Sequence, residues 1–176
     1  MTNQSFKDFV TAKAAEASQP AVDWGQVKED WIIRLGDLVN NVTKWLEPYK
    51  ENIGLEPRVV QLTEEMIGSY QAPMLVITIG HNVVSLEPVG RFLIGVAGRV
   101  DIKGPKGIAR LLVVPKDSSG PRIQVKVAAQ GQTTSTAGIP PVSEWVWKFA
   151  SPPPAIRYTD LTEESFLDAL MGVVNG

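Results

Sequence analysis

Charged residues near the middle of the chain have types and spacing that could do chemistry. Asp101 and Lys103 stand two residues apart in the segment "RVDIK", residues 99–103, and Glu87 followed by Pro88 lies upstream. Side chains two residues apart in a strand point to the same face of a sheet. The triplet is therefore either a metal-and-lysine catalytic pair or the solvated side of an ordinary strand.

The catalytic interpretation depends on a resemblance. Glu87-Pro88 followed by Asp101-x-Lys103 resembles the PD-(D/E)xK motif of metal-dependent nucleases, over about 17 residues. The resemblance implies Mg²⁺ held by carboxylates such as those of Glu87 and Asp101, with Lys103 stabilising the attacking water. That family places a helix between its third and fourth strands, whereas the pattern here continues as strands.

The second interpretation is a charged binding surface. Residues 88–126 contain eight basic and two acidic residues, although the whole chain has a net charge of −2. Like charges side by side favour an anionic partner. The candidate binding residues lie on three neighbouring predicted strands: Arg99, Asp101, Lys103, Arg110, Arg122 and Lys126. Phe92 is the only aromatic residue in this window and is expected to point to the core, so stacking platforms for single-stranded nucleic acid are missing. A protein partner is favoured, and nucleic acid is the less well supported alternative.

Other chemistries are excluded by composition. The chain has no cysteine, which removes disulfides, thiolate nucleophiles and cysteine-ligated zinc. His81 is the only histidine and sits in a "GHN" turn, so a multi-histidine zinc site is impossible. No phosphate-binding loop motif is present. We therefore expect no cofactor, with Mg²⁺ kept for the nuclease alternative.

A long tryptophan-rich helix is predicted near the N-terminus, after a shorter helix within the first 19 residues. Its start is marked by Asp23 as N-cap and Gln26 as capping-box partner. Trp24, Trp31, Leu38 and Trp45 recur every seven residues, and Pro48 marks the end. This spacing predicts one buried helix face lying across a sheet.

After residue 50 the apolar period changes from 3.6 to 2, which predicts strands. The predicted strands cover residues 57–66, 73–79, 83–87, 91–103, 108–114, 122–128 and 143–149. Because the links are short, consecutive strands should be antiparallel neighbours. A C-terminal helix is predicted from Thr162, and its apolar face comprises Phe166, Leu167, Leu170, Met171 and Val174.

The predicted fold is α+β: N-terminal helices, one of them long and rich in tryptophan, packed on a curved antiparallel meander of six to seven strands, with a C-terminal helix. We expect one domain over residues 1–176, with a helical part (1–50), a sheet (57–149) and a C-terminal helix (160–174). No membrane span or secretory signal is visible, so a cytoplasmic location is expected.

The leading functional hypothesis is a non-enzymatic cytoplasmic binding protein, of a chaperone-, inhibitor- or immunity-like kind. It would dock a macromolecular partner through the basic sheet face or the long helix. A carrier of an apolar ligand, held between the sheet and the helix, is a variant of this hypothesis. The alternative is the metal-dependent nuclease with Glu87, Asp101 and Lys103.

Overall fold

The computed structural model describes residues 3–18, 21–91, 96–121 and 141–176. Its helices are α1 (Asn3–Ala17), α2 (Trp24–Leu46) and α3 (Glu163–Asn175), with two short 3₁₀ helices, η1 (Glu47–Tyr49) and η2 (Val142–Glu144). Its strands are β1 (Ile53–Glu64), β2 (Gly68–Ile79), β3 (Asn82–Gly90), β4 (Arg99–Gly104), β5 (Gly107–Val114), β6 (Val146–Ala150) and β7 (Tyr158–Asp160).

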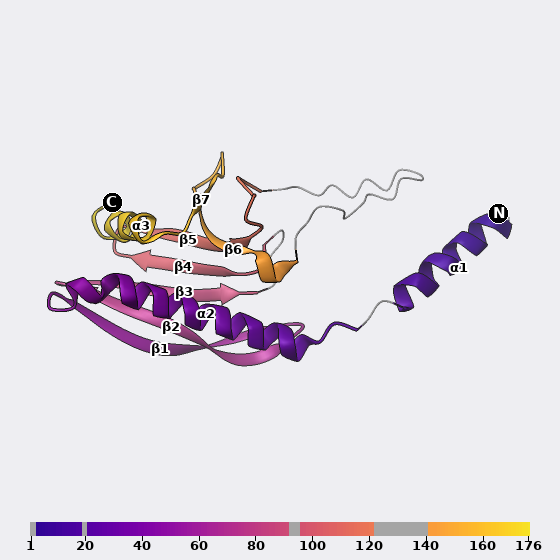
Figure 1. The fold of residues 1–176 in the computed structure, drawn as a ribbon, viewed down its shortest axis with the longest axis horizontal. Helices are drawn as coiled ribbons and strands as arrows, with labels where there is room; N and C mark the ends of the chain where they lie inside the picture. The colour runs from indigo at the N-terminus through magenta and orange to yellow at the C-terminus, as the bar shows by residue number, and fades with distance from the viewer. Residues whose placement is uncertain (1–2, 19–20, 92–95, 122–140) are drawn as a thin grey trace.

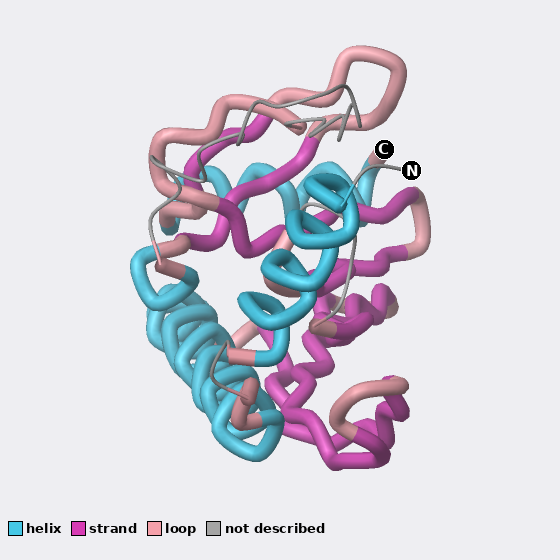
Figure 2. Tube along the Cα trace, turned by 90° about the vertical axis from the view of Figure 1, so that its right-hand side faces the viewer, coloured by secondary structure: helices cyan, strands magenta, loops and turns pink. Residues whose placement is uncertain are grey.

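The seven strands form one antiparallel sheet in the order β1 to β7 (Figure 1). The sheet curves, and α2 and α3 pack on the same face of it, α2 against β2 and α3 against β3, β4 and β5 (Figure 2). The rings of Trp45 and Phe166, 5.7 Å apart, join the two helices. The predicted α+β class, the long N-terminal helix, the antiparallel sheet and the C-terminal helix are confirmed.

Helix α2 begins directly after Asp23, the predicted N-cap. The Asp23 carboxylate accepts a hydrogen bond from the Gln26 backbone N–H at 3.0 Å. The Gln26 side chain donates to Asp30 and not back to the cap, so the predicted capping box is wrong. The buried stripe consists of Trp31, Leu35, Leu38, Val42 and Leu46. A strict seven-residue spacing drifts around a 3.6-residue helix, so Trp24 and Trp45 fall at the edges of this stripe and are half-buried.

Some predicted strand boundaries are wrong. The predicted strand 91–103 becomes β4, which begins only at Arg99, after the pairing register with β3 shifts at Pro88–Gly90. At Gly98 the backbone lies so close to the Trp31 ring that an added Cβ would sit 2.4 Å from it. Residues 92–95 and the predicted strand 122–128 lie outside the described residues. Strand β7 was not predicted, since three residues after a proline-rich segment carry too little pattern.

The C-terminal elements also differ in detail. The predicted strand 143–149 is divided into η2 and β6, with Trp145 capping η2. Helix α3 has Thr162 as its N-cap, with Ser165 completing a capping box. Its buried residues are Phe166, Leu170 and Val173, whereas Met171, predicted on the apolar face, is 56% exposed.

Helix α1 stands apart from the sheet (Figure 1). The side chains from Ser5 to Ala15 are all exposed, including those of Phe6 and Phe9, whose rings stack at 6.4 Å. Among the helices in the described ranges, none is both long and apolar enough to cross a lipid bilayer.

Candidate functional site

The predicted charged face is on the side of the sheet away from α2 and α3, and Asp101 lies at its centre. Asp101 pairs across the ladder with Glu87 of β3 and with Arg110 of β5. The Arg99 guanidinium donates to both Asp101 oxygens, at 2.7 and 2.8 Å. Asp101 was expected to be solvated, but it is only 5% exposed because Arg99 bends along its own strand and pairs with it.

A second ion pair lies beside the first. The Lys103 ammonium donates to Glu87 Oε2 at 2.5 Å, and the Ser85 hydroxyl donates to Glu87 Oε1 at 2.7 Å. The Lys103 hydrogen bond, with help from Ser85, lowers the pKa of Glu87. In turn the carboxylate raises the pKa of Lys103, so both partners stay charged at neutral pH.

The three nuclease candidates are therefore neighbours, but their arrangement does not fit a magnesium site. Both carboxylates already accept hydrogen bonds from cations on the oxygens that a metal would need. The chain passes from β4 to β5 through a tight turn between Gly104 and Gly107, where the nuclease family has a helix. Within the described ranges no three acidic, histidine or cysteine side chains are grouped to hold a metal.

The predicted basic strip is only partly assembled. Arg99 and Lys103 are neutralised by their carboxylate partners, and Arg110 is exposed. Arg122 and Lys126 lie outside the described residues. Lys148, on the neighbouring strand β6, is buried and bonds to Asp160 and to the Ser118 carbonyl, each at 3.0 Å. Among the described cations of this face, Arg99, Lys103 and Lys148 thus have intramolecular partners.

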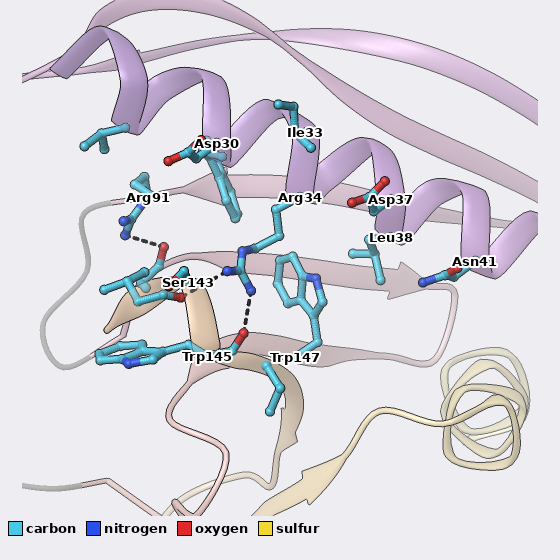
Figure 3. A pocket seen from close by; sticks show the side chains of 15 residues that line it. Asp30, Ile33, Arg34, Asp37, Leu38, Asn41, Arg91, Ser143, Trp145 and Trp147 are labelled. Atoms are coloured by element: carbon cyan, nitrogen blue, oxygen red, sulfur yellow. Dashed lines mark hydrogen bonds between the residues drawn. The ribbon is translucent and has the colours of Figure 1, made fainter. Parts of the chain in front are cut away.

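A more open feature is a groove on the helix side of the sheet, of about 750 Å³ (Figure 3). We call it the α2–β6 groove. One wall is α2, with Asp30, Trp31, Ile33, Arg34, Asp37 and Asn41. The other wall is formed by Arg91, Val142, Ser143, Trp145 and Trp147.

Arg34 joins the two walls of the groove. Its Nη1 donates to the Trp145 carbonyl at 2.7 Å and its Nη2 to the Val142 carbonyl at 3.1 Å, as the dashed lines of Figure 3 show. Arg91 donates to the Ala97 carbonyl at 2.6 Å. Burial lowers the pKa of both arginines, and Asp30 and Asp37 oppose that effect at Arg34. Each guanidinium remains charged, since its pKa stays far above neutral pH.

A hydrogen-bonded chain fixes the end of the groove next to Arg91. The Trp31 indole donates to the Tyr70 hydroxyl at 3.0 Å, and Tyr70 donates to Glu64. The second Glu64 oxygen accepts the Arg91 backbone N–H at 2.9 Å. Burial, followed by the bond to Glu64, raises the pKa of Tyr70, which therefore stays a neutral donor. The chain ties α2, the β1–β2 hairpin and the end of β3 together.

The groove combines apolar walls with balanced charge at its rim. Trp145 and Trp147 are half-buried, Ile33 is 61% exposed and Val142 is 38% exposed. The two arginines face two aspartates, so the groove has no strong preference for an anion or a cation. It fits a segment with one apolar face and mixed charges along its sides.

Sequence reasoning missed this site. Arg34 lies three residues after Trp31 and four before Leu38, which places it beside the buried stripe of α2, and this was the one signal present. Its acceptors are more than 100 residues away along the chain. The three tryptophans of the long helix were assigned to the core; Trp31 is 1% exposed, but Trp24 and Trp45 are half-buried. Trp145, which is half-buried at the groove, was predicted only as part of a strand.

Comparisons with protein-family models, with curated proteins and with solved structures give no match to this chain. The function is therefore argued from the groove and the charged face alone.

Proposed function

We propose that this chain is a non-enzymatic binding protein that docks an amphipathic segment of a protein partner in the α2–β6 groove. Of the two docking surfaces expected from the sequence, the basic sheet face and the long helix, this proposal uses the long helix. The observation that carries it is an aromatic groove beside a long helix, with Ile33 exposed at its mouth. Between Val27 and Asn41, α2 covers a length of about 21 Å.

The dimensions and chemistry support a helical or extended peptide. Recognition of an amphipathic helix uses apolar anchors placed in a hydrophobic groove, with charges at the rim. Tryptophan and arginine, both present here, are enriched at the centres of such interfaces. A small anionic ligand is less well supported, because Asp30 and Asp37 balance the two arginines.

The charged sheet face supports partner binding less well. Arg99 and Lys103 would have to give up short ion pairs before they could meet an acidic surface or nucleic acid. The same pairs make the metal-dependent nuclease the weaker alternative. A cytoplasmic location remains our expectation on composition, since a chain without cysteine needs no oxidising compartment.

Site-specific photo-crosslinking tests the proposal. A benzoylphenylalanine replaces Ile33 in the groove or, as control, Val59 on β1, whose exposures are matched at 61% and 63%. In cells that make the protein naturally, irradiation should give a discrete adduct with another protein from position 33 and none from position 59. Equal adduct patterns from both positions, or no adduct from position 33, would refute the proposal.

A further inference from the structure

Helix α1 has an apolar face that nothing in the described structure covers. Phe6, Phe9 and Val10 are 69%, 57% and 47% exposed and lie on one side of the helix. Two stacked phenylalanines exposed to water carry a large free-energy cost that docking would remove. The groove described above presents exposed apolar side chains of its own, Ile33 and Val142.

We propose that α1 of one copy of this chain occupies the α2–β6 groove of a second copy, and that the exchange is reciprocal. The inference rests on the proposed function, because it uses the same groove and the same mode of recognition. The occupant is a second copy of this chain. While it fills the groove, other partners are excluded, so self-association would regulate their binding.

The two surfaces have similar lengths, and two charges of each can pair. Helix α1 has 15 residues, about 22 Å, and the groove stretch of α2 is about 21 Å long. Lys7 and Lys13 are six residues apart beside the phenylalanines, and Asp30 and Asp37 are seven apart at the rim. An antiparallel α1 would therefore bring Lys13 towards Asp30 and Lys7 towards Asp37.

The connection between α1 and α2 favours a second copy over the chain's own groove. Only six residues, 18–23, separate the helices, and Asp23 is held extended by its capping bond to α2. Pro20 cannot continue a helix and disfavours a helical conformation at the residue before it. In Figure 1 α1 lies away from α2 and the sheet, whereas docking on its own α2 needs the chain to reverse direction within six residues.

The area comes close to what a specific interface needs. An aromatic side chain buries about 150–250 Å². Because Phe6 and Phe9 are 69% and 57% exposed, the four phenylalanines of two arms have about 380–630 Å² left to bury. With a comparable area from the grooves, the total reaches the lower end of the roughly 1,200–2,000 Å² of a specific complex, and a two-fold exchange closes without leaving a free arm.

Disulfide trapping tests the exchange directly, because the natural chain has no cysteine. One tagged variant carries Phe9→Cys and an untagged one carries Ile33→Cys; they are mixed and oxidised. We expect a mixed disulfide-linked dimer that forms about 100-fold faster than from Phe9→Cys mixed with Val59→Cys, because docking raises the local thiol concentration. Val59 matches Ile33 in exposure.

Light scattering after gel filtration supplies a second measurement. The wild-type chain should be a dimer, and Phe6→Asp/Phe9→Asp should be a monomer. A variant with the same two added charges on the other side of α1, Thr11→Asp/Ala15→Asp, should remain a dimer. All four positions are exposed, so the folded body should be unaffected.

A third variant carries Phe9→Cys and Ile33→Cys in the same chain. A monomeric wild-type chain would overturn the inference, and so would an internal disulfide in this variant when the mixture of single variants forms no mixed dimer. The proposed function would still hold if the position-33 crosslinker captured a different protein. If position 33 gave no adduct and the wild-type chain were a monomer, both proposals would be refuted. The mass of the adduct separates the cases, since self-association gives twice the mass of this chain.

Discussion

Two arginine–carboxylate pairs in this chain differ mainly in their surroundings. Arg99–Asp101 and Arg58–Glu56 each join residues two apart in a strand through two hydrogen bonds. Asp101 is buried, whereas Glu56 and Arg58 are exposed. In the exposed pair water competes with both partners, so the ion pair adds little. In the buried pair a lost partner leaves a charge that water reaches poorly.

The comparison predicts unequal effects of the same kind of substitution. Asp101→Asn should lower the free energy of unfolding by about 1.5–3 kcal/mol, the cost of losing hydrogen bonds to a charged group. Glu56→Gln should leave it nearly unchanged. Urea unfolding of the two variants and the wild type checks this. An Asp101→Asn effect no larger than that of Glu56→Gln would show that the buried pair is not structural.

At the scale of elements, Gly98 and Trp31 set how closely α2 approaches the sheet. An added Cβ at residue 98 would lie 2.4 Å from Trp31 Cζ3 and 2.7 Å from Cη2. Trp31 in turn is held by its bond to Tyr70. Because glycine has no side chain, the indole can lie directly against the segment that leads into β4.

Gly98→Ala should therefore destabilise the chain by about 1–3 kcal/mol through overpacking. Trp31→Phe removes the ring atoms that would clash, so the double variant should lose less than the sum of the two single losses. A double-mutant cycle from urea unfolding measures this coupling. Additivity within about 0.5 kcal/mol would contradict the contact.

Element types were predictable from the sequence, because periods of 3.6 and 2 follow from which faces are buried. The start of α2 was predictable from the Asp23 cap, and the buried position of Trp31 from its stripe. The boundary of β4 was not, because it depends on a register shift at Pro88–Gly90 and on the contact of Gly98 with a helix far along the chain.

The candidate site was less predictable than the fold. The alternation "RVDIK" correctly placed Arg99, Asp101 and Lys103 on one sheet face, but it could not show that Arg99 would bury Asp101. The groove depends on Arg34 meeting Val142 and Trp145, and no local pattern reports a contact across such a distance in sequence.

At the scale of the whole molecule, Arg34 connects α2 to the other wall of the groove. Its planar guanidinium reaches two carbonyl groups of the segment before β6 at once. Lysine keeps the charge but offers a single point of donation, so it cannot span both acceptors. The position of that segment, and hence the shape of the groove, depends on this residue.

Arg34→Lys should leave the core folded but loosen residues 142–145. We expect the amide hydrogens there to exchange about tenfold faster, the factor that corresponds to losing about 1.4 kcal/mol. Peptides from β4 and β5 should keep their protection. Hydrogen exchange with mass spectrometry checks this against Arg58→Lys, an exposed control. Unchanged exchange in residues 142–145 would contradict the role of Arg34.

The sheet ends at β1, a twelve-residue strand whose outer side pairs with none of the other described strands. An open edge of that length is a template on which unfolded chains could add strands and aggregate. Pro57 interrupts it, since proline offers no N–H to an incoming strand, and the charged Glu56 and Arg58 flank the gap. Residues 56–58 therefore hinder the addition of further strands to this open edge, the step by which fibrils grow.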